Sequence, residues 1–265
     1  MSKRIDVRDL RVVYAERGDS FTALDGVSFS VEPGEFVSVI GASGCGKSTL
    51  LAVLEGLLPP ESGSVSVDGE QVSGPGPERS VVFQQYSLFP WMTALGNVEF
   101  ALGQARPDLK RKERRELAGE YLKKVALEGF ENRFPKELSG GQQQRVAIAR
   151  ALAEDGEVLL MDEPFGAIDA RNRALLQDLL LELWEGEAGA SRKTVVFVTH
   201  DLEEAILLSD RIIMMEPGRV RAVFDVPLPR PRHRLSLLQD PAYVAFRGEL
   251  AKIFFENEYQ EVHSA

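Results

Sequence analysis

Apolar and polar residues alternate along the first 31 positions of the chain, which is the pattern of β-strands with one buried face. The alternation is interrupted by Gly18-Asp19-Ser20, a sequence that is typical of a turn. The apolar positions are Ile5, Val7 and Val12 to Tyr14 before the turn, and Val27, Phe29 and Val31 after it. The pattern therefore predicts two antiparallel strands at the start of the chain.

A different pattern begins at Glu35, where short and nearly continuous apolar runs replace the alternation. Such runs are expected of strands that are covered on both faces of a sheet. They occupy residues 36–40, 81–83, 158–161 and 195–198, and helical segments separate them. This order predicts an α/β core that is built on a mostly parallel sheet.

Two further segments complete the predicted organisation. Residues 91–155 have little strand character and include the helix-forming segment Lys110 to Val125, so we expect a helical insert there. Alternating prolines keep residues 228–234 extended. A terminal helix with one docked apolar face is then predicted from the helical spacing of Tyr243, Phe246, Leu250 and Ile253. We divide the chain into a domain over residues 1–227 and a Pro/Arg-rich connector with a C-terminal helix over residues 228–265.

Composition narrows the class of protein. The 265 residues are 44% hydrophobic, which is enough to bury a core, and the formal net charge of −10 disfavours general nucleic-acid binding. A single cysteine fits a reducing compartment. The N-terminus lacks the apolar region of a secretory signal, and no run of 18 apolar residues would span a bilayer. We expect a cytoplasmic protein whose membrane role, if it has one, comes through a partner.

The segment after the first buried run matches the phosphate-binding pattern G-x-x-x-x-G-K-[ST]. It follows a predicted strand and opens an apolar helix, so its backbone N–H groups and the helix N-terminus can bind phosphates. In this reading Lys47 contacts the β- and γ-phosphates and Ser48 ligates Mg²⁺. The alternative is a glycine-rich turn with an exposed lysine. The residues are Gly41, Ala42, Ser43, Gly44, Cys45, Gly46, Lys47, Ser48 and Thr49.

Cys45 lies inside this loop and has two interpretations. A helix N-terminus can lower the pKa of a thiol, which would suit a redox switch. The simpler interpretation is a small side chain that fits the loop, and nothing else in the sequence indicates redox chemistry.

Two carboxylates, Asp162 and Glu163, follow the buried run at 158–161. The carboxyl ends of parallel strands are where α/β sheets bind ligands. Asp162 is suited to hold Mg²⁺ and Glu163 to polarise an attacking water.

Farther back, Ser139-Gly140-Gly141-Gln142 fits the S-x-x-Q capping box before a helical run and would form a second anion site. The alternative to an anion site is an ordinary capped helix.

In this order, the motifs resemble those of the ATP-binding subunits of ABC transporters, over about residues 5–225. The segment Leu138 to Gln142 is similar to the LSGGQ signature of that family. The resemblance implies an α/β P-loop NTPase fold of the ABC ATPase type. Such a fold has a RecA-like, mostly parallel sheet core, an N-terminal antiparallel β subdomain and a helical insert.

The resemblance also assigns roles to residues that the motifs alone leave open. Tyr14 is similar to the aromatic residue that stacks on adenine, although a half-buried strand aromatic is the alternative. Gln84 matches the Q-loop glutamine, an assignment that could shift to Gln85. Residues 166–169, ending in Asp169, match the D-loop, and His200 matches the switch histidine, although a lone histidine after a strand is usually only a satisfied polar group.

The implied chemistry is hydrolysis of ATP with Mg²⁺ in a head-to-tail homodimer, where Lys47 of one copy and Ser139 of the other enclose one nucleotide. Glu163, His200, Gln84 and Lys47 would be catalytic. The metal ligands would be Ser48, Gln84 and Asp162. Nucleotide contacts would come from Tyr14, the phosphate loop, Ser139, Gly140, Gly141, Gln142 and Asp169.

The implied partners are transmembrane permease subunits and, indirectly, a solute-binding protein, which places the chain at the inner face of the cell membrane. The aromatic segment Tyr86 to Trp91 would dock a cytoplasmic helix of the permease, or is simply a packed loop. The tail at 228–234 is similar to that of importers for nitrate, sulfonate and taurine. The alternatives are an ABC-type ATPase acting on nucleic acid or the ribosome, and a plain P-loop kinase or GTPase.

Two residues depart from the family pattern. Ile168 stands where the D-loop usually has leucine. Glu55 occupies a position on the helix after the phosphate loop that is normally small or apolar, and we expect it to affect local packing outside the chemistry.

Overall fold

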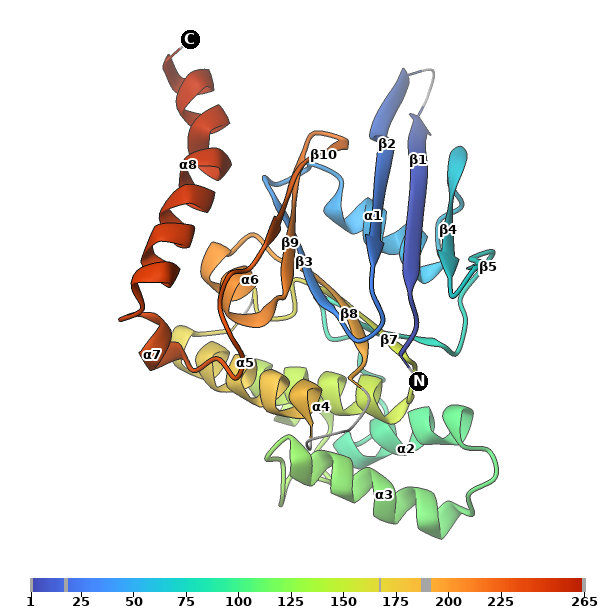
Figure 1. Ribbon diagram of the computed structural model, residues 1–265. Helices are drawn as coiled ribbons and strands as arrows, with labels where there is room; N and C mark the ends of the chain where they lie inside the picture. The colour runs from blue at the N-terminus through green and yellow to red at the C-terminus, as the bar shows by residue number, and fades with distance from the viewer. Residues whose placement is uncertain (1, 17–18, 167, 187–191, 264–265) are drawn as a thin grey trace.

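The structure is a computed structural model that describes residues 2–16, 19–166, 168–186 and 192–263. It contains two sheets with helices packed around them (Figure 1). The first sheet has the order β2-β1-β4-β5 and is antiparallel throughout. Its strands are β1 (Ile5–Glu16), β2 (Asp19–Val31), β4 (Ser62–Val67) and β5 (Glu70–Gln71). The predicted antiparallel pair is thus confirmed as β1 and β2, although Gly18 of the predicted turn lies outside the described residues.

The second sheet is the α/β core that the apolar runs predict. Its order is β10-β9-β3-β8-β7-β6, and every neighbouring pair from β9 to β6 is parallel. The strands are β3 (Phe36–Gly41), β6 (Arg79–Val82), β7 (Val158–Asp162), β8 (Thr194–Val198), β9 (Arg211–Glu216) and β10 (Arg219–Asp225). The run predicted at 81–83 is a strand only to Val82, and the hairpin of β9 and β10 adds a pair that the sequence analysis did not predict.

The helices fall between these strands. Those of the segment 91–155 are α2 (Ala94–Ala105), α3 (Arg111–Lys124), the 3₁₀ turn η1 (Pro135–Glu137) and α4 (Gly140–Ala153). The others are α1 (Lys47–Glu55), α5 (Ala170–Glu185), α6 (Leu202–Leu208), α7 (Arg234–Leu237) and α8 (Pro241–His263). Among the described residues, no helix has the length and apolar character needed to cross a membrane.

The buried side chains form two clusters on the two faces of the parallel sheet. Alternate residues of β3 show the division, because Val37 and Val39 belong to one cluster whereas Phe36 and Ile40 belong to the other. The first cluster contains α1 and the antiparallel sheet. The second contains helices α2 to α6 and α8. Helix α1 and helix α4 therefore cover opposite faces of the same sheet (Figure 1).

The C-terminal helix docks by the face that its sequence predicts. Tyr243, Phe246 and Leu250 are buried against the second cluster, and Ile253 is partly buried there. An ion pair of 2.9 Å between Arg247 and Glu203 connects α8 to α6. Burial of three large apolar side chains contributes several kcal/mol at about 25 cal/mol per Å², so apolar packing holds α8 in place.

Truncating Leu250 tests this docking. Leu250 is fully buried, so Leu250→Ala should lower the free energy of opening α8 by about 2–4 kcal/mol through lost burial and a residual cavity. Hydrogen exchange of the α8 amides should accelerate at least tenfold. Leu235→Ala, at a leucine that is 78% exposed, is the matched control and should change exchange little. Equal exchange in the two variants would mean that α8 is not held by its apolar face.

Candidate active site

The parallel sheet brings the sequence motifs to one edge. The phosphate loop follows β3, Gln84 follows β6, Asp162 ends β7 and His200 follows β8. These four strands are consecutive neighbours in the order β3-β8-β7-β6, and parallel pairing aligns their carboxyl ends. Residues that are more than 150 positions apart in the sequence therefore share one site.

The phosphate loop has the backbone conformation that its glycines allow. Gly44 and Gly46 have φ values of 80° and 107°, in the left-handed region. At Gly46, a Cβ atom would lie 2.7 Å from the Ala23 carbonyl oxygen, so any larger residue would displace the loop. Gly46 is also the N-cap of α1 and provides no side-chain cap, which leaves the first N–H groups of the helix directed at the loop's concavity.

Lys47 is buried at the base of this loop. Its ammonium group donates hydrogen bonds to the carbonyl oxygens of Gly41 and Ala42, at 2.8 and 2.9 Å. The lysine is therefore not the exposed side chain of an ordinary turn, because its charge is held against the loop that would enclose a phosphate. This geometry favours the phosphate-binding interpretation.

Cys45 is buried inside the phosphate loop, where its Sγ atom accepts a hydrogen bond from Lys47 Nζ over 3.8 Å. The residue is only 2% exposed, and its Sγ atom would be 2.6 Å from a Cβ atom at Gly41. Burial raises the pKa of the thiol, although the nearby Lys47 lowers it. A buried thiol with a raised pKa is a poor redox switch, so the structure supports the interpretation of a small side chain that fits.

Ser48 and Asp162 form the part of the site that suits a divalent cation. The Ser48 hydroxyl donates to Asp162 Oδ1 over 3.4 Å. The pKa of Asp162 is raised above its ordinary value, mainly by burial. The hydrogen bond from Ser48 and the charge of Lys47 lower this pKa, whereas the charge of Glu163 raises it. In the part of the chain that the structure describes, no group of three or more His, Cys, Asp or Glu side chains is arranged to hold a metal ion. One carboxylate and one hydroxyl fit Mg²⁺, which takes few protein ligands and completes its shell with water and substrate phosphates.

The side chain of Glu163 is held between two polar neighbours. Gln84 donates from Nε2 to Glu163 Oε2 over 3.3 Å, and His200 Nδ1 lies 3.3 Å from the same oxygen. Glu163 has a φ of 41°, which is uncommon for a residue with a side chain, and its N–H donates to the Val198 carbonyl. Among the described residues Gln84, and not Gln85, makes the contact with Glu163, which favours Gln84 for the predicted role.

Tyr14 is placed beside the phosphate loop, on β1. Its side chain is 42% exposed, and its hydroxyl lies 3.4 Å from Thr49 Oγ1 at the start of α1. Phe21 is paired with Tyr14 across β1 and β2 and is 63% exposed. Directly opposed residues of an antiparallel pair share one face of the sheet, so Phe21 is a second exposed aromatic that the sequence analysis missed.

The Ser-Gly-Gly segment begins α4 and lies on the other side of the parallel sheet from α1. Ser139 accepts a hydrogen bond from the Gln142 N–H, and Gln142 accepts one from the Ser139 N–H, which completes the predicted capping box. Asp169 caps the neighbouring helix α5 in the same way, through Asn172. Of the predicted D-loop, Ala167 lies outside the described residues.

Within one copy, the two predicted anion sites remain separate. In the described part of the chain, no hydrogen bond or ion pair joins residues 139–142 to residues 41–48. Their helices, α4 and α1, cover opposite faces of the parallel sheet. One copy therefore presents two candidate anion sites that its own fold does not bring together.

Comparison with known proteins identifies this arrangement. A family model described as ABC transporter matches residues 24–166, more than half of the chain. The chain belongs to the ABC transporter family.

Curated relatives cover most of the same length. An uncharacterized ABC transporter ATP-binding protein of Methanocaldococcus jannaschii is 47% identical over 89% of this chain and 87% of its own. The nitrate import ATP-binding protein NrtD of Synechococcus elongatus is 46% identical over 86% and 83% of the two chains. The bicarbonate transport ATP-binding protein CmpC of that organism is 44% identical over 92% of this chain but only 36% of its own length.

A solved structure shares the fold. The dimeric ATP-binding cassette MJ0796 in a post-hydrolysis state, bound to ADP and Pi, has a TM-score of 0.75 and 36% identity. The alignment covers 85% of this chain and 100% of the MJ0796 chain. The predicted fold class is thus confirmed, and the chain is an ATP-binding, ATP-hydrolysing subunit of the ABC type.

Glu55 lies behind the site of this ABC ATPase, at the far end of α1. The residue is only 7% exposed. Burial, with a smaller contribution from the Asp162 charge, raises its pKa from 4.5 to about 7. The Asp162 charge is the link that this pKa shift gives between Glu55 and the site, and the expectation that Glu55 lies outside the chemistry stays a prediction.

A neutral side chain of the same shape at position 55 should remove a loss of folding stability that grows as the pH rises. A carboxyl whose pKa is higher in the folded chain loses folding stability as the pH rises from about 4.5 to 7. Glu55→Gln should therefore raise the free energy of unfolding at pH 8 by on the order of 2–3 kcal/mol relative to wild type, and change it little at pH 5. Urea unfolding at both pH values, without nucleotide or Mg²⁺, measures the difference.

The matched control is Glu182→Gln, which makes the same substitution at an exposed glutamate on α5. If Glu55→Gln were equally stabilising, or equally neutral, at both pH values, the raised pKa of Glu55 would be contradicted.

Proposed function

We propose that this ABC ATPase drives an importer, and that two copies of the chain enclose each ATP between the phosphate loop of one and the Ser139 segment of the other. The observation that carries the catalytic part is the Glu163 carboxylate, held by Gln84 and His200 beside the phosphate loop. A carboxylate whose orientation is fixed at the carboxyl edge of the sheet is suited to accept a proton from water.

The chain's own residues divide the reaction into distinct tasks. Lys47 and the N–H groups of the loop would bind the β- and γ-phosphates of the substrate ATP. Glu163 would take a proton from a water molecule while the oxygen of that water bonds to the γ-phosphorus of ATP. The bond between the γ-phosphorus and the bridging oxygen would break, and ADP would leave with that oxygen. His200 would donate a hydrogen bond toward the γ-phosphate, and Gln84 would position the water. Mg²⁺, held by Ser48, Gln84 and Asp162, would neutralise phosphate charge.

A second copy is needed to complete the nucleotide site. Ser139, Gly140, Gly141 and Gln142 form the capped start of α4, a helix that packs on the opposite face of the parallel sheet from α1 and its phosphate loop. A triphosphate between two N–H-rich surfaces would attract both, and hydrolysis would remove that attraction. The solved relative is a dimer bound to ADP and Pi, which supports this arrangement. Asp169, next to the Ser139 segment, would add a nucleotide-proximal contact.

Import of a small solute is supported by the relatives. Two of them are named for nitrate import and bicarbonate transport. We propose nitrate, sulfonate, taurine or a related small solute, delivered by a solute-binding protein to permease subunits. The ATPase would then lie at the cytoplasmic face of the membrane, attached through the permease. In this scheme residues 1–227 form the ATP-binding domain, residues 91–155 its helical insert and residues 228–265 an accessory tail.

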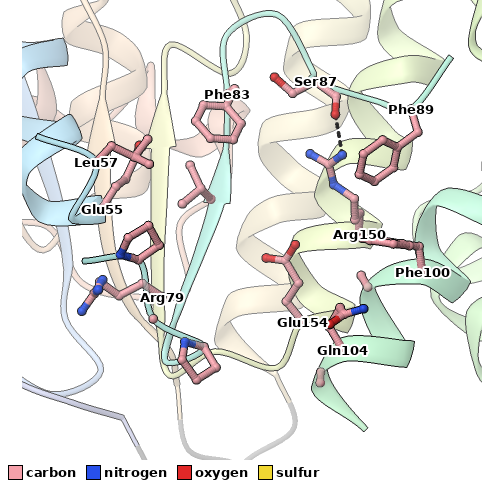
Figure 2. A pocket seen from close by; sticks show the side chains of 16 residues that line it. Glu55, Leu57, Arg79, Phe83, Ser87, Phe89, Phe100, Gln104, Arg150 and Glu154 are labelled. Carbon is pink, nitrogen blue, oxygen red and sulfur yellow. Dashed lines mark hydrogen bonds between the residues drawn. The ribbon is translucent and has the colours of Figure 1, made fainter. Parts of the chain in front are cut away.

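A groove beside the Tyr86–Trp91 segment is the proposed permease site. It has a volume of about 450 Å³, and Figure 2 shows Leu57 on one side, Phe83 near one end, and Phe89 and Phe100 on the other side. We name it the docking groove. Trp91, next to Phe89, is 70% exposed. Exposed aromatics beside a concave apolar surface are typical of sites that bind another protein.

The catalytic assignment predicts the behaviour of Glu163→Gln. Loss of the general base should reduce ATP hydrolysis about 100-fold or more, while ATP still binds and holds two copies together. Sedimentation with saturating ATP and Mg²⁺ should show a dimer, and the same protein without nucleotide should not. Adding Lys47→Ala should abolish the dimer, because the phosphates lose their cation. A Glu163→Gln protein that stays monomeric with saturating ATP would count against the shared site.

The adenine assignment predicts a second set of results. If the Tyr14 ring stacks on adenine, Tyr14→Ala should weaken ATP binding about tenfold, and Tyr14→Phe should restore it because the ring is kept. Phe21→Ala is the matched control in the paired strand. Fluorescence titration with an ATP analogue measures each affinity. Weakening by Phe21→Ala but not by Tyr14→Ala would transfer the role to Phe21.

A further inference from the structure

We propose that Glu55 makes the docking groove selective for a basic side chain, so that the permease segment that fills the groove inserts a lysine or arginine against the Glu55 carboxylate. This inference rests on the proposed function, because it names the chemistry of the partner that the docking groove would take. It departs from the expectation that Glu55 only affects packing.

The first observation is that Glu55 is buried and has no counterion. Its side chain lines the docking groove, and only 7% of the residue is exposed. Among the described residues, no hydrogen bond or ion pair engages its carboxylate. Buried carboxylates are normally paired, because removing an unpaired charge from water is costly. The groove wall therefore contains an acid that none of the described residues pairs with.

The second observation is that the other charges of the docking groove are already engaged. Arg79 pairs with Glu78 and donates to the Gly74 carbonyl oxygen. Arg150 donates to the carbonyl oxygens of Ser87, at 2.5 Å, and Tyr86, at 3.3 Å; the contact with Ser87 is drawn in Figure 2. Both guanidinium groups thus hold the chain's own backbone in place. Neither is an ion-pair partner of Glu55.

The third charged side chain of the groove, Glu154, is also engaged. The charge of Arg150 and hydrogen bonds from Ser80 and the Val81 backbone lower its pKa, against the larger effect of burial, which raises it. Figure 2 shows Glu154 on the side of the groove that also holds Arg150, across from Glu55. Glu55 is therefore the lining charge that a bound partner would find unpaired.

The surroundings of Glu55 define what the occupant looks like. Leu57 is 59% exposed beside it, and Phe83, Phe89 and Phe100 form the remaining apolar walls. A volume of about 450 Å³ admits a few side chains of one segment. The occupant that fits is a segment with apolar side chains for the aromatic walls and one cation for Glu55. An entirely apolar segment would bury the acid further without pairing it.

The electrostatics of the empty groove agree with this assignment. Burial and the Asp162 charge raise the pKa of Glu55 to about 7, so the free groove holds a partly protonated acid at neutral pH. A lysine or arginine in the groove would favour the ionised form and replace the contacts with water that burial removed.

A charge-exchange experiment tests the proposal. The probe is the purified permease subunit of the same transporter in lipid nanodiscs, and the measurement is the dissociation constant of the ATPase without nucleotide. Glu55→Gln, which keeps the shape of the side chain, should weaken binding about tenfold or more. Glu55→Lys should weaken it further by repulsion. Glu182→Lys is the control for the same charge change on an exposed surface, and it should bind within about threefold of wild type.

The permease supplies the second half of the test. Each lysine and arginine of its cytoplasmic loops is changed to glutamate, and one of these variants should restore binding of Glu55→Lys to within about threefold of the wild-type pair. The corresponding neutral variant should add no loss to that of Glu55→Gln, which is the result for two groups that act as a pair.

The outcomes separate this inference from the proposed function. If the wild-type chain does not bind the permease, the proposed function fails. If it binds, but Glu55→Gln and Glu55→Lys bind as tightly as Glu182→Lys, the selectivity is contradicted. It is also contradicted if both Glu55 variants bind weakly and no permease variant shows pairing with either. Circular dichroism confirms that each variant is folded, and Glu55→Gln alone carries the test if Glu55→Lys is not.

Discussion

Parallel pairing of β3, β8, β7 and β6 is the constraint on which the site depends. Parallel strands need long crossover connections, so residues that meet at one edge of the sheet come from distant parts of the sequence. The register pairs Val39 with Val198 and Val198 with Asp162, which brings the ends of β3, β8 and β7 to one level. Glu163 N–H then bonds the Val198 carbonyl, and its side chain lies between residues that follow β6 and β8.

The same sheet separates the surfaces of the two candidate anion sites. Helix α1 packs with the antiparallel sheet on one face, whereas α4 packs among the helices on the other. Because both helices begin with unsatisfied N–H groups, each surface favours an anion, but no rotation of one rigid chain could direct both at the same phosphate. An ATP that contacts both surfaces has to join two copies. In this view the proposed homodimer would follow from the layering of the fold, and the energy of nucleotide binding would become energy of association.

The sequence predicts the architecture well, because buried parallel strands appear as short, nearly continuous apolar runs that can be recognised without knowledge of the tertiary structure. It also predicts the individual motifs, because their glycines, lysine and adjacent carboxylates stand at fixed spacings along the chain. The β9–β10 hairpin escaped prediction although Ile212 to Met215 forms a continuous apolar run, since one such run in a helix-rich region has an ambiguous period. What the sequence does not contain is the direction of side chains. That Cys45 is buried, that Phe21 is exposed beside Tyr14 and that Glu55 is buried without a counterion all depend on packing between distant segments.

Helix α1 connects the candidate active site with the docking groove, because one of its ends lies at each. Lys47 and Ser48 begin the helix at the phosphate loop, and Glu55 ends it at the docking groove, about 12 Å away at 1.5 Å per residue. In a chain with a net charge of −10, surface acids attract any basic partner, and salt screens them. A buried acid differs, because its pairing needs a cation at one position and is weakly screened. Long-range charge can therefore bring a basic segment to this protein, but selection between such segments requires an acid placed as Glu55 is.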